Sequence, residues 1–366
     1  LEVMYPYFSE HFGNPASTMH IYGWEAEAAV KQAREILAES IGASPEEIIF
    51  TSGATEANNL AIKGVAEAYL SKGRHIITLA TEHSAVLDPC RYLETLGFEV
   101  TYLPVESDGL VNLQALDRAI RPDTVLVSIM AANNEIGVIQ PLAEIGAICR
   151  SHAAIFHTDA AQAIAKIPLN VQAMKIDLMS ITGHKVYAPK GIGALYVRRK
   201  NPRVTIAPQL HGGGHERGMR SGTLYTPQIV GLGKAVAIAL ESLTTEQIHI
   251  QFLRDRLWNL INQPLNNLTG IYLNGHPTQR LAGNLNISVS GVDGNALLLG
   301  LQPVMAVSSG SACSSAKKAP SHVLTALGIS EALAYASIRF GIGRFNTESE
   351  IIQVADHFIS TVRNLR

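Results

Sequence analysis

Short apolar runs alternate with longer segments of helical periodicity through the first two thirds of the chain. Apolar runs of four to six residues, rich in β-branched side chains, are typical of buried strands. The segments between them carry apolar residues at helical spacing over roughly ten to fifteen residues. This alternation predicts an α/β fold with a mostly parallel sheet and helices on both faces. The expected strands are Ile48–Thr51, His75–Leu79, Val100–Leu103, Val125–Met130, Ile155–Thr158, a run from Leu178 and Ala194–Val197.

Two helix starts carry recognisable capping patterns. Ser44-Pro45-Glu46-Glu47 has a serine followed three residues later by a glutamate, with proline in the first turn. The same spacing recurs at Thr347 and Glu350. The helix predicted from Thr347 then buries one apolar face at alternating spacings of four and three, made of Ile351, Ala355, Phe358, Val362 and Leu365.

The pattern changes after about Gly222. A long helical region is predicted from Pro227 to about Asn262, and a break at Gln263-Pro264 follows it. Beyond the break lie the shorter strands Ile271–Leu273 and Leu285–Val289. We therefore expect a large domain of residues 9–262 and a smaller α+β domain made of residues 1–8 and 263–366.

Composition narrows the function classes. Charged residues are 16% of the 366 residues and hydrophobic residues 47%, which favours extensive burial, including a subunit interface. The 29 basic and 31 acidic residues nearly cancel, so nothing favours nucleic acid or an anionic membrane surface. No apolar run approaches the roughly 18 residues of a membrane span. The amino end has no basic segment followed by an apolar one, so no signal peptide is visible there.

The three cysteines, Cys90, Cys149 and Cys313, are too few and too scattered for a disulfide framework or a CxxC metal site. A reducing compartment is therefore expected, and we predict a cytoplasmic protein. Cys90 and Cys149 lie in helical patterns and are expected to be small buried apolar residues. Cys313 lies in a different setting, a run of small and polar residues from Ser308 to Ser315.

Candidate chemistry gathers after the predicted strands, where open α/β sheets bind ligands. Lys185 follows one strand and could form a Schiff base with an aldehyde cofactor, although a lone lysine is more often a solvated charge. Ser52-Gly53-Ala54-Thr55 opens a helix and could hold a phosphate or simply cap the helix. Strand ends also carry polar residues that could each be ordinary turn residues, namely His83, Asn134 and Asp159. No GxGxxG or Walker sequence opens a helix.

Several stretches together resemble one family. They are Thr51–Glu56, Thr81–His83, Asn133–Gly137, His157–Gln162, Gly183–Lys185, His211–Thr223, Ser308–Cys313 and Ser337–Phe340. In this order they resemble cysteine desulfurases of the NifS/IscS type, which are pyridoxal-phosphate enzymes of aminotransferase class V with fold type I. The resemblance implies that the large domain binds pyridoxal 5'-phosphate and that the smaller carboxyl-terminal domain carries the catalytic cysteine loop.

The resemblance also implies a role for each matching residue. Lys185 would hold the cofactor as a Schiff base and move protons, with His83 stacked on the ring and helping in proton transfer. Asp159 would pair with the pyridine nitrogen and Gln162 with the ring oxygen. The remaining cofactor contacts would come from Ala54, Thr55, Asn134, Thr182, Gly183, His184 and, from the second subunit of a homodimer, Thr223.

The resemblance further implies the reaction. Arg339 would bind the substrate carboxylate with help from Asn134, because a guanidinium makes two parallel bonds to a carboxylate. Cys313 would lie on a loop that is expected to be mobile. It would attack the sulfur of L-cysteine, giving L-alanine and a persulfide. The expected acceptor is an iron–sulfur scaffold protein or another sulfur acceptor. No metal is required, although Cys313 is a candidate for transient ligation of an iron–sulfur cluster.

Three departures and two alternatives accompany the resemblance. Relatives begin with a further amino-terminal strand and an Ala-Thr-Thr turn, many have serine where Thr182 stands, and many continue beyond Arg366 with a tail that meets the scaffold. One alternative is a selenocysteine lyase or another class V enzyme, which would share Lys185 and Asp159 without needing Cys313. The other is a non-catalytic binding subunit, which the full residue set argues against.

Overall fold

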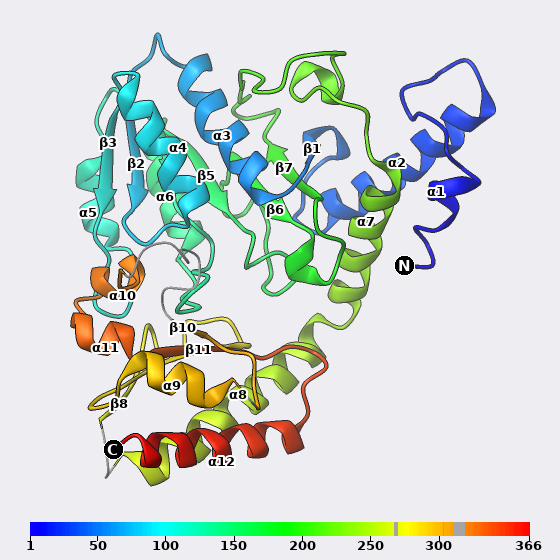
Figure 1. The fold of residues 1–366 in the computed structure, drawn as a ribbon. Helices are drawn as coiled ribbons and strands as arrows, with labels where there is room; N and C mark the ends of the chain where they lie inside the picture. The colour runs from blue at the N-terminus through cyan, green and yellow to red at the C-terminus, as the bar shows by residue number, and fades with distance from the viewer. Residues whose placement is uncertain (267–269, 303, 310–318) are drawn as a thin grey trace. The chain divides into compact units, whose positions relative to one another are not determined.

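The computed structural model describes residues 1–266, 270–302, 304–309 and 319–366 (Figure 1). By internal contacts the chain forms two units. The first contains Leu1–Leu103, Asn112–Ala131 and Gln140–Leu243, and the second contains Pro104–Val111, Ala132–Ile139 and Thr244–Arg366. This division differs from the expected domains, 9–262 and 1–8 with 263–366, at the amino terminus, at residues 104–111 and 132–139, and beyond residue 243. The expected domains stay a prediction.

The first unit is built on a mostly parallel sheet, as the sequence predicts. Its strand order is β1-β7-β6-β5-β4-β2-β3. Only β7 runs antiparallel to its neighbours, β1 and β6. Every strand except β3 is buried at all positions, which explains their apolar sequences. The strands are β1 (Ile48–Thr51), β2 (His75–Leu79), β3 (Glu99–Leu103), β4 (Thr124–Ser128), β5 (Ile155–Asp159), β6 (Leu178–Thr182) and β7 (Gly193–Val197).

Helices pack on this sheet and close its core. Helix α3 contacts β1, β4, β5, β6 and β7 and also α4, as Figure 1 shows. Its apolar residues, including Ala57, Leu60 and Val65, join the buried cluster under the sheet. The helical elements of this unit are α1 (Pro6–Ser9), α2 (Ile21–Glu39), η1 (Pro45–Glu47), α3 (Ala54–Ala68), α4 (Ser84–Thr95), α5 (Leu113–Ala119), α6 (Leu142–Ser151), η2 (His184–Val186), η3 (Glu216–Gly218) and α7 (Thr226–Glu241).

The strand directions bring several loops to one edge of the sheet. Strands β2, β4, β5 and β6 are parallel. Strand β1 points the same way, because both β1 and β6 are antiparallel to β7. Gly193 of β7 pairs with Thr51 on one side and with Thr182 on the other. The segments that follow β1, β2, β5 and β6 therefore leave the sheet at the same edge.

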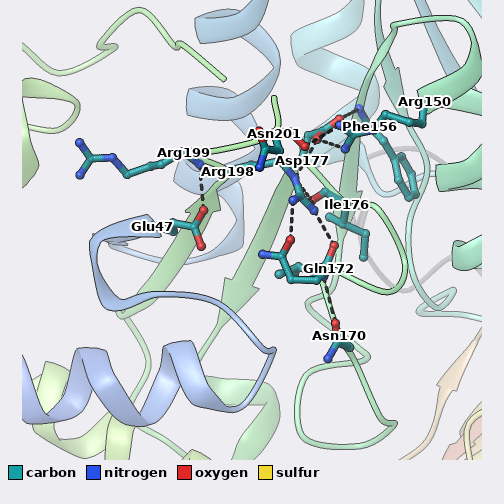
Figure 2. A network of polar contacts seen from close by, with 11 residues as sticks. Glu47, Arg150, Phe156, Asn170, Gln172, Ile176, Asp177, Arg198, Arg199 and Asn201 are labelled. Atoms are coloured by element: carbon teal, nitrogen blue, oxygen red, sulfur yellow. Dashed lines mark hydrogen bonds and ion pairs between the residues drawn. The ribbon is translucent and has the colours of Figure 1, made fainter. Parts of the chain in front are cut away.

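A buried polar network fixes the amino ends of β5 and β6, away from the edge where the loops after these strands leave the sheet (Figure 2). Asp177, which precedes β6, accepts a hydrogen bond of 3.0 Å from the Phe156 backbone N–H through Oδ2. Its Oδ1 lies 2.9 Å from Arg150 Nη2 and 3.0 Å from Arg198 Nε. Arg198 also donates to the Gln172 side chain at 2.6 Å. Because the buried carboxylate is paired with cations and a backbone donor, the network holds both strands in register.

The second unit has its own sheet and core. Its strands pair antiparallel in the order β10-β11-β9-β8. Helices α8, α9 and α12 contribute to a buried cluster with β8, β9 and β11. The strands are β8 (Ile271–Leu273), β9 (Asn284–Val289), β10 (Ser308–Ser309) and β11 (Ser337–Gly341), and the helices are α8 (Leu243–Leu265), α9 (Gly294–Leu301), α10 (His322–Ala326), α11 (Glu331–Tyr335) and α12 (Glu348–Asn364).

Both capping patterns are confirmed, and one helix prediction needs correction. Ser44 and Glu47 form a reciprocal cap on η1, and Thr347 and Glu350 form one on α12. The helical region expected from Pro227 to about Asn262 is present as two helices, because Ser242 ends α7 and α8 begins at the next residue. The break expected at Gln263-Pro264 is wrong, since Pro264 lies inside α8, which ends at Leu265. Within the described ranges, no helix combines the length and apolar character needed to cross a membrane.

Candidate active site

The turn before α3 presents backbone donors at the shared edge of the sheet. Gly53 precedes the helix with a φ of 148°, a conformation that favours glycine. The turn lies close against β7, since a Cβ on Gly193 would stand 2.6 Å from Gly53 Cα. Gly53 has no side chain with which to cap the helix. The first backbone N–H groups of α3, at Ala54 and Thr55, therefore point toward a position that suits an anion.

Asp159 ends β5 with its carboxylate buried and oriented. The residue is 5% exposed. Its Oδ2 accepts a hydrogen bond of 2.7 Å from Asn58 Nδ2 on α3, and its Oδ1 accepts one of 2.8 Å from the Ala161 backbone N–H. Burial raises the pKa of Asp159, while these bonds and nearby His83 oppose that rise. A cationic ring nitrogen would stabilise such a carboxylate as the anion.

His83 stands at the start of α4 and is fixed by its own helix. Its Nδ1 accepts a hydrogen bond of 3.0 Å from the Ala85 backbone N–H, which caps the helix. In the neutral ring this bond assigns the proton to Nε2. A pocket of about 350 Å³ is lined by His83 together with Thr55 and Lys63 of α3. The imidazole is therefore accessible from a cavity beside the turn at Gly53.

Lys185 lies in η2, directly after β6, and is exposed. The chain turns sharply there. Gly183 accepts no side chain, because a Cβ would meet Ile192 Cγ2 at 2.9 Å, and Tyr187 adopts a left-handed conformation with φ of 64°. Thr182 Oγ1 lies 3.0 Å from His184 Nδ1. The β6 end thus carries a hydroxyl, an imidazole and an amine within four consecutive residues.

A second lysine lies near Lys185. Burial lowers the pKa of Lys166 to about 8, and the positive charge of Lys185 contributes to the shift. Lys166 follows the Asp159–Gln162 turn, where Gln162 is partly exposed. The positive charges of the two ammonium groups therefore repel each other at this edge of the sheet.

Sequence reasoning missed three residues of this region. Asn58 and Glu82 are fully buried, and Glu82 Oε1 accepts a hydrogen bond of 2.7 Å from the Met130 backbone N–H. Burial raises the pKa of Glu82 well above its usual range, and the charge of Asp159 adds to this rise. Lys166 is the third. The signal that could have found Asn58 is a polar residue on the apolar face of α3.

The second unit holds the two expected substrate-binding residues together. Arg339 on β11 donates a hydrogen bond of 2.7 Å from Nη1 to the Asn134 backbone carbonyl. The Asn134 turn is stabilised by Asn133 Oδ1, which accepts from the backbone N–H groups of Glu135 and Ile136. Asn134 Oδ1 is buried and has no hydrogen-bond partner among the residues described here. An acceptor in this state is suited to a ligand that donates.

The structure brings some of the predicted site residues together and leaves others apart or outside the described ranges. The first unit brings Ala54, Thr55, His83, Asp159 and the residues after β6 to one sheet edge. Thr223 lies on an exposed segment between η3 and α7. Cys313 and its expected mobile loop lie outside the described residues. Cys90 on α4 and Cys149 on α6 are buried, as expected. Burial raises the pKa of the Cys90 thiol to about 12, so this thiol is inert at neutral pH.

Comparisons with known proteins identify the family of this chain. The family model for aminotransferase class-V matches residues 1–354. The cysteine desulfurase IscS of Rickettsia rickettsii (strain Iowa) is 54% identical over 366 residues, which are 100% of this chain and 88% of that protein. A solved structure titled NifS-like protein has a TM-score of 0.91 and 38% identity, covering 100% of this chain and 95% of that chain.

A second solved structure, titled SspA in complex with cysteine, has a TM-score of 0.82 and 41% identity. The match covers 94% of this chain and 95% of that chain. These likenesses extend over nearly the whole chain, and the structural ones confirm the expected fold of this enzyme type. The chain belongs to the aminotransferase class-V family, and it is a pyridoxal-phosphate-dependent enzyme of the cysteine desulfurase type.

Proposed function

We propose that this enzyme converts L-cysteine to L-alanine, forms a persulfide on Cys313 and supplies sulfur for iron–sulfur cluster assembly and other sulfur-containing products. The observation that carries the proposal is the set of functional groups at one edge of the first sheet. There a buried carboxylate at the end of β5, an uncapped helix start after β1 and a lysine after β6 lie at the same edge of the sheet. Relatives named cysteine desulfurase support the same activity.

The residues present fit pyridoxal 5'-phosphate. The uncapped start of α3 supplies backbone donors for a phosphate at Ala54 and Thr55, with Thr182 and His184 beside them. Asp159 is buried and oriented for a cationic pyridine nitrogen. Further contacts would come from His83 against the ring and from Asn134, Gln162, Gly183 and Lys185. When bound, the cofactor supplies an aldehyde for the amines and a ring that takes up the electron pair of the broken bond.

Each proton in the proposed reaction has a residue to carry it. Lys185 Nζ is the base that takes the proton from the substrate Cα and returns it. His83 exchanges protons through Nε2, because Nδ1 is occupied by the Ala85 N–H. Asp159 holds the proton on the ring nitrogen by its negative charge. Asn58 and Ala161 keep that carboxylate aimed in one direction.

The substrate carboxylate is assigned to Arg339. Its Nη1 is held by the Asn134 carbonyl at 2.7 Å, which fixes the guanidinium plane and leaves its other N–H groups for a bidentate carboxylate. The Asn134 side-chain oxygen is an acceptor without a partner in the described part of the chain. It can accept a hydrogen bond from the bound ligand. Lysine at position 339 would supply charge without the fork.

The sulfur step is assigned to Cys313. Its thiolate attacks the substrate sulfur, the Cβ–S bond breaks, and the electron pair and a proton remain with the alanyl fragment. The balance is L-cysteine plus enzyme thiol giving L-alanine plus enzyme persulfide. No external oxidant is needed. The persulfide is then passed to a thiol of an iron–sulfur scaffold protein or another acceptor, and Cys313 is regenerated.

A homodimer is part of the proposal. Thr223 is exposed, which suits a contact with the phosphate in the second subunit. Within the first 24 residues several large apolar side chains are exposed, and subunit contacts commonly bury side chains of this kind. They are Leu1, Val3, Tyr5, Phe8, Phe12, Met19, Ile21, Tyr22 and Trp24. Sedimentation at micromolar concentration should show a dimer, and a fully active monomer would contradict this part. We infer a cytoplasmic location, because the three scattered cysteines indicate a reducing compartment.

The test of the proposed function is product analysis. The purified protein, loaded with cofactor, is mixed with L-cysteine and a thiol reductant, and sulfide and alanine are measured. Equal amounts of both products are expected. Alanine without sulfide, or neither product, would contradict the proposal. Selenocysteine in a parallel reaction measures the substrate preference, and turnover of selenocysteine alone would favour a selenocysteine lyase instead.

A further inference from the structure

Glu56 connects the turn before α3 to a distant segment of the first unit. It is the third residue of the helix, and its Oε2 accepts a hydrogen bond of 2.8 Å from the Ser52 backbone N–H. Arg220 donates to the same carboxylate twice, from Nε to Oε1 at 2.8 Å and from Nη2 to Oε2 at 3.2 Å. Both side chains are 18% exposed. Three donors from two segments therefore converge on one largely buried carboxylate.

The carboxylate shapes the turn but carries a charge that opposes a phosphate. By binding the Ser52 N–H, Glu56 closes the turn whose next residues, Ala54 and Thr55, provide the donors assigned to the cofactor phosphate. A negative charge one turn from a phosphate dianion would repel it by Coulomb interaction. Burial alone would raise the pKa of Glu56, but the bonds from Arg220 and Ser52 outweigh it and lower the pKa. The group is therefore ionised at neutral pH.

Arg220 cancels that charge and is itself held in place. A Cβ on Gly222 would lie 3.1 Å from Arg220 Nη1, so the guanidinium packs against a glycine with φ of 124°. The Gly222 backbone N–H donates to His215 Nδ1 at 3.2 Å. Thr223 follows directly. The same arginine thus anchors the segment that carries Thr223, which we assign to the second subunit's phosphate.

We propose that Arg220 is a positioning residue for cofactor binding: its two bonds to Glu56 allow the turn at 52–56 to keep its shaping carboxylate and still accept a phosphate dianion. This inference rests on the proposed cofactor site. Arg220 acts without itself contacting the phosphate. Its effect passes through the charge of Glu56, which gives the inference a signature that separates it from a general loss of stability.

The test compares two ligands on the apoenzyme, prepared by removing the cofactor from the purified protein. Dissociation constants for pyridoxal 5'-phosphate and for pyridoxal are measured from the absorbance change on binding. Arg220→Met should weaken pyridoxal phosphate about tenfold or more and leave pyridoxal within about twofold, because only the phosphate senses the uncompensated charge. Arg220→Lys keeps the charge and should stay within about threefold of the original protein for both ligands.

A second variant completes the cycle. Glu56→Gln removes the opposing charge and should bind pyridoxal phosphate at least as tightly as the original protein. The double variant Glu56→Gln with Arg220→Met should recover most of the affinity that Arg220→Met loses. A double variant as weak as Arg220→Met would overturn the inference. So would equal weakening of both ligands, or an Arg220→Met variant that binds pyridoxal phosphate normally.

The remaining outcomes also distinguish the role of Arg220 from the proposed function. If Arg220→Met does not fold, Glu56→Gln decides alone, and a tenfold weaker affinity for pyridoxal phosphate with normal pyridoxal binding would overturn the inference. Failure of the original apoenzyme to take up pyridoxal phosphate would instead contradict the proposed function. Normal uptake by the original protein and by Arg220→Met alike would contradict only the role of Arg220.

Discussion

Asn58 and Asp159, which are 101 positions apart in sequence, are joined by a buried hydrogen bond of 2.7 Å from Asn58 Nδ2 to Asp159 Oδ2. Asn58 lies on α3, two residues after Glu56, and Asp159 ends β5. The bond therefore couples the helix that presents its first N–H groups to a phosphate with the carboxylate assigned to the ring nitrogen. One helix sets the position of both ends of the proposed cofactor.

The first prediction concerns this bond. Asn58→Ala should lower kcat about 10- to 100-fold with a smaller change in KM, because Asp159 loses its orienting donor and no longer holds the ring-nitrogen proton firmly. The pH profile of the cofactor absorbance should shift as well. The matched control is Asn274→Ala, a buried asparagine of the second unit that bonds Asn286 and Ser288. It should lower stability without moving the absorbance, and a shift as large as that of Asn58→Ala would contradict the assignment.

The second prediction concerns the two neighbouring lysines. Borohydride should fix the cofactor covalently to the original protein and to Lys166→Gln, but not to Lys185→Ala, because only Lys185 is assigned to the cofactor aldehyde. Mass spectrometry of the digested protein locates the modified residue. A cofactor adduct on Lys166, or a reducible adduct that survives in Lys185→Ala, would show that the wrong lysine has been chosen.

The third prediction follows from a buried histidine. His157 on β5 lies between two hydroxyls, 2.8 Å from Ser128 Oγ and 2.9 Å from Ser180 Oγ, and burial lowers its pKa to about 3. The unfolded chain has a histidine pKa of about 6.5. Between these values the unfolded state binds a proton that the folded state does not. The stability that neutral His157 contributes is therefore present above pH 6.5 and lost as the pH falls toward 3.

His157→Asn should remove this pH dependence. Between pH 7 and pH 5 the original protein should lose about 2 kcal/mol more unfolding free energy than the variant loses. Urea unfolding at both pH values, at one protein concentration, measures the difference. The expected change is in the slope with pH, whatever the variant's stability at pH 7. An equal loss in both proteins would mean that His157 is not the group responsible.

The fourth prediction concerns substrate recognition. Arg339→Gln should raise KM for L-cysteine about 10- to 100-fold, because the fork that binds the carboxylate is lost. Cofactor content should remain normal, since Arg339 is assigned to the substrate alone. Arg363→Gln, on the exposed side of α12, is the matched control and should keep the original KM. Normal KM in Arg339→Gln would remove this residue from the substrate site.

Much of the fold follows from local sequence patterns. The parallel sheet could be predicted because its strands are buried on both faces and are therefore continuous apolar runs. The caps at Ser44 and Thr347 could be predicted because the partners lie three residues apart. The division between α7 and α8 at Ser242 could not, since no proline or glycine marks it and the apolar periodicity continues across it.

The site could be predicted only in part, because some of its contacts join residues that are far apart in the sequence. Asp159 ends a strand, and Lys185 and His83 lie within four residues after a strand, so strand prediction alone brings them to the sheet edge. Asn58 and Arg220 act through partners more than a hundred positions away. Their local sequence shows only a polar residue in an apolar helix face and an arginine in a glycine-rich segment.

The most direct test of the central claim compares Cys313→Ser with Cys90→Ala. Cys90 is buried in α4, so its variant should release sulfide and alanine from L-cysteine at a rate within about twofold of the original protein. Cys313→Ser should still bind the cofactor and change its absorbance on adding L-cysteine, because Lys185, Asp159 and Arg339 are intact. It should release almost no sulfide, since a hydroxyl does not replace a thiolate as a nucleophile toward sulfur. Sulfide release by Cys313→Ser at the original rate would contradict the persulfide mechanism.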